Sequence, residues 1–322
     1  GELPSIETVY TPDDRTSIEG VTVSRSGLYV SLLQNVKGSI LRFGVEAKSG
    51  EWRAEPLPLP PSGTVSLSAA NPHSGTVFVN YEDHITPDRL SEYDAGANAL
   101  TRLKALPARF RADGLLVSQH TVRSADGEAV PYFIIHRKGL KPDGSTPTIL
   151  YGYGGFEISL KPSYSATIGK LWLERGGAYA VANIRGGGEF GPRWHKAALK
   201  TNRQRAYDDF IAVAEDLAKR GITSPKRLGI SGGSNGGLLV GAIFTQRPDL
   251  MNAVVCRVPL LDMLRYSKLL AGASWVGEYG DPEDSIMREA ILKYSPYQNM
   301  FPGRKYPKVF IETSTKDDRV HP

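Results

Sequence analysis

Short apolar runs separated by turn-forming residues fill the first third of the chain. Turns are marked by dipeptides such as Asn71-Pro72 and Ser74-Gly75, and no segment before residue 107 keeps a helical period. The strand-like runs are residues 27–33, 38–43, 64–67 and 75–81. Runs of this length between turn signals predict antiparallel strands. We therefore expect residues 1–107 to form an all-β module, either a sandwich or the blades of a propeller.

The pattern changes after residue 107. A hairpin is expected over residues 120–136, with its turn at Asp126-Gly127, and buried-looking strands then alternate with helical stretches. The expected strands are 148–151, 178–183, 227–230, 253–256 and 308–312. Apolar residues recur at helical spacing over 206–217, with Asp208 and Asp209 away from the apolar face. The alternation predicts an α/β domain over residues 108–322, whose parallel sheet is covered on both faces.

Composition narrows the class of protein. The chain has 322 residues, 23% of them charged, and a net charge of only +5. Lys and Arg form no block that would indicate a nucleic-acid partner, and no apolar stretch is long enough to span a membrane. The single cysteine, Cys256, excludes an internal disulfide and lies in an apolar run where a buried strand residue is expected. No zinc pattern of Cys and His is present, so we expect neither a metal nor a cofactor.

A G-x-S-x-G motif formed by Gly232, Ser234 and Gly236 carries the candidate chemistry. The motif follows the apolar strand that ends at Ile230 and precedes an apolar helix that begins near Leu238. This is the strand–turn–helix context of a nucleophile elbow, in which glycines let strand and helix pack closely. The N-terminus of the following helix favours developing negative charge. The sequence therefore predicts that Ser234 is the nucleophile of a serine hydrolase.

A serine nucleophile needs a histidine base and a carboxylate that orients the base. In this fold the acid follows a late strand and the histidine comes last, so Asp317 and Asp318, after strand 308–312, are both candidates. His195 lies upstream of the serine and is expected to be structural or to line a cleft. His321 is too close to the acid to belong to the next strand and is kept only as a lesser candidate for the base. We expect the chain to be a piece of a longer protein. The piece would lack the C-terminal strand and helix of the domain, and the histidine base would lie in that missing part.

Several motifs in order make the chain similar to the prolyl oligopeptidase family of serine peptidases from about residue 108 onward. These motifs occupy residues 150–156, 182–189, 224–227, 232–237, 293–296 and 317–320. The resemblance implies an α/β-hydrolase peptidase domain, doubly wound around a mostly parallel sheet and incomplete at its C-terminus. It also implies that residues 1–107 are the last blades of a seven-bladed β-propeller.

The same resemblance implies residue roles. Asp317, the first of the acidic pair, would orient the histidine, and the oxyanion would be held by the backbone N–H of Asn235 and the hydroxyl of Tyr153. Chemistry alone would leave Tyr151 as an alternative to Tyr153. Arg319 would donate to the carbonyl before the proline, although a local salt bridge to an adjacent Asp is also credible. The hydrophobic slot for proline would be lined by Phe156, Leu260, Trp275, Tyr279 and Val320, with Leu260 bulkier than the expected valine.

These roles predict an endopeptidase that hydrolyses short peptides on the carboxyl side of proline through an acyl-enzyme. Its partners would be proline-containing oligopeptides, and it would be a cytoplasmic monomer, with a periplasmic or secreted location as the alternative. The elbow alone also permits a carboxylesterase or lipase on the same fold. A third reading is a hydrolase-like binding module with an incomplete triad.

Overall fold

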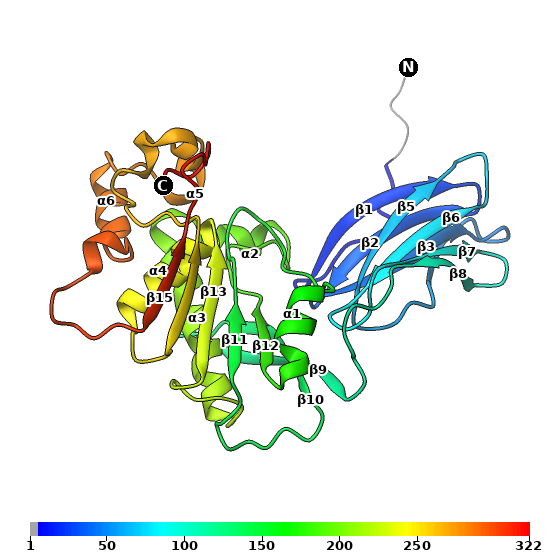
Figure 1. The fold of residues 1–322 in the computed structure, drawn as a ribbon. Helices are drawn as coiled ribbons and strands as arrows, with labels where there is room; N and C mark the ends of the chain where they lie inside the picture. The colour runs from blue at the N-terminus through cyan, green and yellow to red at the C-terminus, as the bar shows by residue number, and fades with distance from the viewer. Residues whose placement is uncertain (1–5) are drawn as a thin grey trace. The chain divides into compact units, whose positions relative to one another are not determined.

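The structure, a computed structural model, describes residues 6–322 of the chain. The first five residues of the predicted all-β module lie outside the described residues. The chain divides into two compact units. The all-β unit comprises residues 1–108, 161–164 and 189–191, and the α/β unit comprises 109–160, 165–188 and 192–322. Figure 1 traces both units along the chain.

Two four-stranded antiparallel sheets form the all-β unit, and each follows the order of its strands in the chain. This up-and-down arrangement is that of a β-propeller blade, as the resemblance implied. The first sheet contains β1 (Thr16–Ser24), β2 (Gly27–Gln34), β3 (Lys37–Val45) and β4 (Trp52–Pro56). The second contains β5 (Thr64–Ala70), β6 (Val77–Glu82), β7 (Arg89–Asp94) and β8 (Ala99–Ala105).

The core of the all-β unit explains which strands the sequence pattern revealed. One cluster of buried side chains joins the sheets, and it includes Tyr29, Ile40, Val65, Val77 and Tyr93. The predicted strands 27–33, 38–43, 64–67 and 75–81 correspond to β2, β3, β5 and β6, which supply most of this cluster. The strands β1, β4, β7 and β8 were not predicted. Most residues of β4 and β8 are exposed, so these strands carry no apolar run.

A seven-stranded sheet is the frame of the α/β unit, in the order β15-β14-β13-β11-β12-β10-β9. The first five strands in this order, from β15 to β12, pair in parallel with one another. Strand β10 pairs antiparallel with both β12 and β9. The strands are β9 (Leu115–Arg123), β10 (Ala129–Arg137), β11 (Thr148–Tyr151), β12 (Ala178–Ala182), β13 (Leu228–Gly233), β14 (Ala253–Arg257) and β15 (Lys308–Glu312). The predicted hairpin and the mostly parallel sheet are confirmed.

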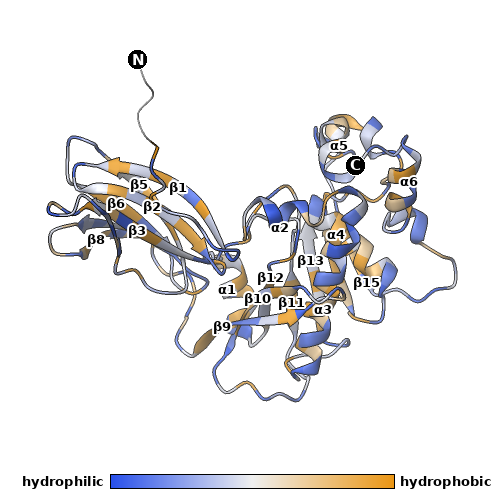
Figure 2. Cartoon of the chain, turned by 180° about the vertical axis from the view of Figure 1, so that it is seen from behind, coloured by the Kyte–Doolittle hydropathy of each residue, from blue (hydrophilic) through white to orange (hydrophobic). Residues whose placement is uncertain are grey.

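Helices cover this sheet. The α-helices are α1 (Ala166–Leu171), α2 (Pro192–Lys196), α3 (Gln204–Lys219), α4 (Asn235–Gln246), α5 (Val276–Tyr279) and α6 (Ser285–Leu292). Short 3₁₀ turns are η1 (Leu173–Arg175), η2 (Lys200–Asn202), η3 (Tyr266–Lys268), η4 (Leu270–Trp275) and η5 (Tyr297–Asn299). Helix α4 packs against β13 and β14, and α3 packs against α4, β9 and β10. Figure 2 shows apolar residues on α4 and the central strands.

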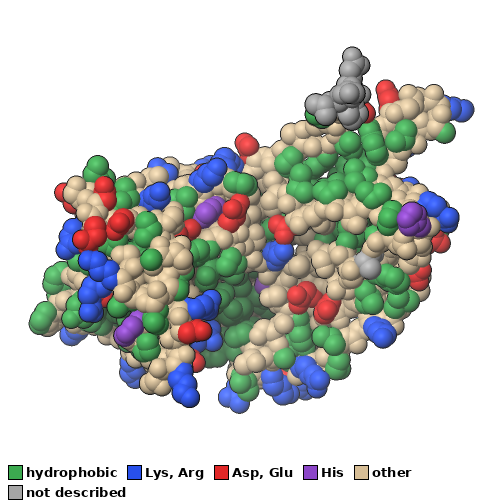
Figure 3. Space-filling model, turned by 90° about the horizontal axis from the view of Figure 1, so that it is seen from above, with side chains coloured by type: hydrophobic (Ala, Val, Ile, Leu, Met, Phe, Trp, Pro, Cys, Tyr) green, Lys and Arg blue, Asp and Glu red, His purple; other side chains and the backbone are tan. Residues whose placement is uncertain are grey.

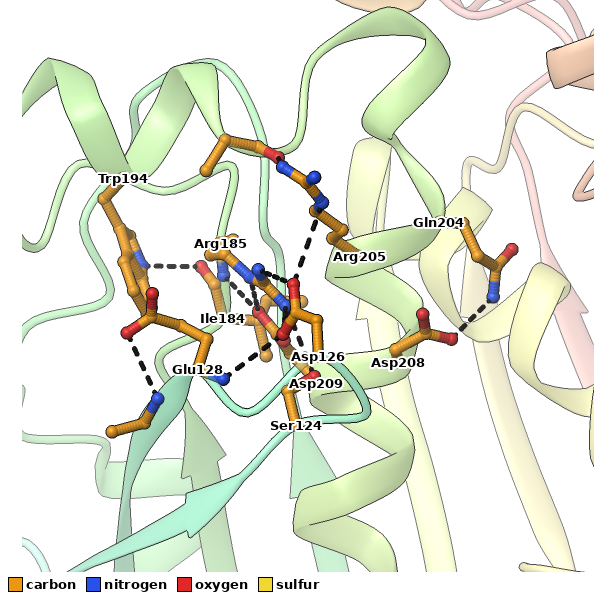
Figure 4. A network of polar contacts seen from close by, with 12 residues as sticks. Ser124, Asp126, Glu128, Ile184, Arg185, Trp194, Gln204, Arg205, Asp208 and Asp209 are labelled. Atoms are coloured by element: carbon orange, nitrogen blue, oxygen red, sulfur yellow. Dashed lines mark hydrogen bonds and ion pairs between the residues drawn. The ribbon is translucent and has the colours of Figure 1, made fainter.

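One prediction about α3 was wrong. Its apolar positions are buried as expected, but Asp209, which we placed away from the apolar face, is fully buried as well. The Arg185 guanidinium lies against Asp209 at 2.6 Å and also bonds Asp126 of the β9–β10 turn, as Figure 4 shows. The helical period sorts residues by hydropathy, and it cannot reveal an arginine from a distant loop that neutralises a buried carboxylate.

Three predictions from composition concerned the cysteine, membrane-spanning segments and surface charge. Cys256 is fully buried in β14, as predicted, and burial raises the pKa of its thiol to about 12. Among residues 6–322, no helix is long and apolar enough to cross a membrane. On the face drawn in Figure 3, basic and acidic side chains are interspersed over the surface.

Candidate active site

Ser234 occupies the sharp turn between β13 and α4. Its backbone has φ 56° and ψ −118°, a conformation that a non-glycine residue adopts only when its surroundings enforce it. Its N–H donates to the carbonyl of Arg257 on β14 at 2.9 Å. A Cβ on Gly232 would lie 2.1 Å from the carbonyl oxygen of Gly236, so the turn closes only with glycine there. The predicted elbow is thus built from a strained serine and closely packed backbone.

Tyr153 lies beside the serine. It follows β11, whose C-terminal end neighbours that of β13, and its ring lies beside the elbow, where a Cβ on Gly236 would be 3.5 Å from Cδ2 of Tyr153. Burial raises the pKa of Tyr153, so the phenol stays protonated and can donate a hydrogen bond at neutral pH. The structure therefore brings Tyr153 to the serine, whereas Tyr151 remains within β11.

Asn235 begins α4 directly after the nucleophile and is fully buried. The first N–H groups of a helix have no intrahelical acceptor, so the backbone N–H of Asn235 is a donor at this position. Its side chain is held on both sides: Nδ2 donates to the carbonyl of Tyr153 at 2.6 Å, and Oδ1 accepts from the hydroxyl of Tyr279 at 2.8 Å. The two predicted oxyanion donors therefore flank Ser234 and are linked to each other.

Asp317 lies in the loop after β15. Its Oδ1 accepts from the backbone N–H groups of Arg319 (3.0 Å) and Val320 (2.9 Å), and these donors hold the pKa of the carboxyl below its usual range. An ionised carboxylate fixed by its own loop is the kind of group that can orient a histidine. Arg319 is exposed, and its charge contributes to lowering the pKa of Asp317, but among the described residues its guanidinium forms no ion pair with Asp317 or Asp318. The alternative role for Arg319 as a local salt bridge is therefore not observed.

The five predicted slot residues fall into two groups. Leu260, Trp275 and Val320 line an apolar pocket of about 320 Å³. Phe156 and Tyr279 instead contact each other edge to face, with ring centroids 5.7 Å apart. Tyr266 connects the groups, because it lines the pocket and its ring lies 5.4 Å from that of Tyr279. Sequence reasoning missed Tyr266, which lies outside every motif that we used.

The two histidines weighed as the base, His195 and His321, are bonded to partners other than Ser234. His195 bonds Glu278 through Nε2 at 2.7 Å, and the His321 ring contacts the carbonyl of Pro322. Among the described residues, no histidine is hydrogen-bonded to Ser234. The location of the base outside residues 1–322 stays a prediction.

Sequence reasoning also missed two buried charges close to the elbow. The Arg203 guanidinium bonds the Asn235 side chain at 2.6 Å, and the Glu278 carboxylate bonds Arg203 at 3.1 Å. Glu278 is adjacent to Tyr279 in the sequence and could have been noticed as a charge within a predicted apolar slot. Arg203 lies in a polar run that resembles any exposed segment.

Among the described residues, no group of His, Cys, Asp and Glu side chains is arranged to hold a metal ion.

A strained serine elbow on a mostly parallel sheet, with a tyrosine and a helix N-terminus beside the serine, is typical of the α/β-hydrolase fold. The model of the prolyl oligopeptidase family matches residues 162–322. The chain belongs to the prolyl oligopeptidase family.

Individual relatives agree with this assignment. The chain is 51% identical over 98% of its length to an uncharacterized peptidase, y4nA, of Sinorhizobium fredii, and it covers 43% of that protein. It is 43% identical over 83% of its length to the prolyl endopeptidase of Elizabethkingia meningoseptica, and covers 38% of it. A post-proline cleaving enzyme from Rickettsia typhi matches 99% of the chain with a TM-score of 0.90 and 39% identity, over 46% of its own length. The chain thus spans less than half the length of these relatives.

Proposed function

We propose that the full-length protein is a serine endopeptidase that cleaves short peptides on the carboxyl side of proline. The observation that carries the proposal is the elbow itself, where Tyr153 lies beside the strained Ser234 and α4 begins at Asn235. The prolyl endopeptidase relatives support proline as the residue that is recognised.

In the proposed reaction, Ser234 Oγ attacks the carbonyl carbon of the proline residue and transfers its proton to a histidine that Asp317 orients. The carbonyl oxygen becomes an oxyanion, which accepts from the Tyr153 hydroxyl and the Asn235 N–H. The histidine then protonates the leaving amine, and water hydrolyses the acyl-enzyme by the same route. Each oxyanion donor of this kind contributes about 3–4 kcal/mol of transition-state stabilisation.

Proline suits a slot of apolar side chains because it is compact and has no backbone N–H to satisfy. Leu260, Trp275 and Val320 supply such a surface, and Trp275 offers a ring on which the proline can stack. The exposed Arg319 guanidinium is available to donate to the carbonyl that precedes the proline. These contacts favour a peptidase over an esterase, since a small ester needs no donor for a peptide backbone.

The test compares the full-length wild-type protein with its Ser234→Ala variant on a Gly-Pro anilide, a Gly-Ala anilide and a p-nitrophenyl ester. We expect the wild type to prefer the Gly-Pro anilide, and the variant to lose roughly 10⁴-fold or more in kcat. Turnover of the ester alone would indicate a carboxylesterase. A wild type that neither turns over any substrate nor reacts with a fluorophosphonate at Ser234 would indicate a binding module.

The same proposal includes two further expectations, that the full-length protein is a monomer and that it has no nucleic-acid partner. The interspersed charges on the face in Figure 3 support the absence of a nucleic-acid partner, because nucleic-acid binding requires a basic patch. Sedimentation of the full-length protein with and without duplex DNA would test both expectations. The cytoplasmic location is tested by cell fractionation.

A further inference from the structure

Arg203 and Glu278 form a buried ion pair that the proposed reaction does not use. Their side chains are 1% and 4% exposed, and Nη1 of Arg203 lies 3.1 Å from Oε1 of Glu278. Removing two charges from water costs several kcal/mol per ion, and their attraction repays this only when the surrounding hydrogen bonds are also satisfied. The bonds that complete this pair therefore indicate what the pair does.

The first set of bonds leads from Arg203 to the residue after the nucleophile. Nη2 donates to Oδ1 of Asn235 at 2.6 Å, and the guanidinium lies 5.3 Å from the ring centre of Tyr279. Because a guanidinium can only donate, it forces the Asn235 amide to turn its oxygen toward Arg203 and its Nδ2 toward the carbonyl of Tyr153. Arg203 thus orients the amide that anchors Tyr153.

The second set of bonds leads from Glu278 to the same loop. Oε1 accepts from the backbone N–H of Phe156 at 3.0 Å, and Oε2 bonds His195 Nε2 at 2.7 Å. Phe156 has φ 56°, a left-handed conformation that a bulky residue adopts only under constraint. The segment 153–156 is therefore held at both ends, by Asn235 at its first carbonyl and by Glu278 at its last N–H.

We propose that Arg203 and Glu278 are positioning residues that hold the Tyr153 hydroxyl against Ser234 through the loop 153–156. The bonds form a closed ring that runs from Asn235 to Tyr153, along the backbone to Phe156, and back through Glu278 and Arg203. The ion pair itself touches neither the nucleophile nor the substrate. The inference rests on the proposed function, because its effect is expressed only through the oxyanion donor.

A double-mutant cycle in the full-length protein tests the proposal. Glu278→Ala removes the acceptor for the Phe156 N–H, and Tyr153→Phe removes the hydroxyl that the loop presents. We expect each change to lower kcat on a Gly-Pro anilide by roughly 10²-fold. The loss of kcat in the double variant should be at least tenfold smaller than the product of the two single losses. Once Tyr153 has no hydroxyl, displacing the loop by Glu278→Ala removes no further oxyanion donor.

Two further variants keep the test decisive. Glu278→Gln retains an oxygen that can accept from Phe156, so we expect it to restore at least tenfold of the kcat lost in Glu278→Ala. Tyr132→Phe is the matched control, since it removes a partly buried hydrogen bond from a tyrosine hydroxyl to Asp216 (2.7 Å) elsewhere in the α/β unit. Its effect should multiply with that of Tyr153→Phe, without coupling.

The outcomes separate the two proposals. Losses that multiply for Glu278 and Tyr153, as they should for Tyr132, would overturn the positioning role and leave the peptidase intact. A wild type that does not cleave the anilide would instead overturn the proposed function. If Glu278→Ala does not fold, the same cycle with Arg203→Lys decides, because a lysine keeps the charge but cannot bridge Asn235 and Glu278 with a planar fork.

Discussion

The glycines around the nucleophile differ in how much space the surrounding backbone leaves for a side chain. A Cβ on Gly232 would meet the Gly236 carbonyl oxygen at 2.1 Å, and one on Gly237 would meet the Arg257 carbonyl oxygen at 2.7 Å. A Cβ on Gly233 would have only ordinary contacts, the nearest at 3.7 Å. The motif therefore combines positions where strand and helix backbones touch with one position that has room for a side chain.

This difference predicts opposite results for two neighbouring substitutions. Gly232→Ala should lower the free energy of unfolding by about 3 kcal/mol or more, because rigid backbone rather than a flexible side chain blocks the new methyl group. Gly233→Ala, its matched control, should stay within about 1 kcal/mol of wild type, because alanine fits a strand without strain. Urea unfolding of the two variants checks this. Equal losses of unfolding free energy in the two variants would show that the close approach of Gly232 and Gly236 is not what requires glycine at position 232.

Element by element, α3 is anchored by a polar contact as well as by its apolar face. Asp209 has no exposed side-chain surface, and it bonds both the backbone N–H (3.0 Å) and the guanidinium of Arg185. Asp208 is its neighbour on the same helix, but it is only half-buried and bonds Gln204 four residues earlier at 2.9 Å. Figure 4 shows the two carboxylates in these different surroundings. One of them therefore joins α3 to the loop after β12, and the other stays within its helix.

Replacing each aspartate by alanine separates these roles. Asp209→Ala leaves the Arg185 guanidinium with Asp126 and Ser124 as its partners and without its buried carboxylate, so we expect a loss of about 3–5 kcal/mol in the free energy of unfolding. Asp208→Ala should cost less than about 1 kcal/mol, because its bond is local and partly hydrated. Chemical denaturation monitored by circular dichroism measures both. A loss below 1 kcal/mol for Asp209→Ala would contradict the anchoring role.

At the same scale, sequence reasoning succeeded where a segment is uniformly apolar and failed where partners come from afar. The ranges 148–151 and 308–312 match β11 and β15, because both strands carry short apolar runs, although β11 lies inside the sheet and β15 lies at its edge with Phe310 and Ile311 exposed. The elbow was located by its glycines. Arg203 and Glu278 were missed, because the contacts that bury them come from residues far apart in the chain. No local pattern encodes such a contact.

On the scale of the whole molecule, both units bury ionisable groups. The α/β unit buries opposite charges together, such as Arg203 with Glu278. The all-β unit buries His84, which follows β6 and is 7% exposed. Burial lowers the pKa of His84 to about 4, against a smaller opposing effect of the adjacent Asp83 charge and a hydrogen bond with the backbone of Ser163. Its imidazole is therefore neutral at pH 7.

A neutral buried histidine makes the stability of the all-β unit depend on pH. In the unfolded chain its pKa is about 6.5, so the unfolded state binds the proton first as the pH falls. The stabilisation is complete above about pH 6.5 and is lost progressively down to about pH 4. At pH 5 the loss is about 2 kcal/mol, which corresponds to a roughly 30-fold increase in the population of the opened state.

Hydrogen exchange measured by mass spectrometry tests this in the full-length protein. After correction for the intrinsic chemical rate, exchange in peptides from β6 and β7 should accelerate roughly 30-fold between pH 7.5 and pH 5. His84→Gln, which cannot titrate, should reduce this change to less than about threefold. Peptides from β11 and β13 are the internal reference, because His84 does not belong to their unit. The same acceleration in the His84→Gln variant would assign the pH dependence to other groups, and the carboxylates of the all-β unit, beginning with Asp83, would be the next to replace.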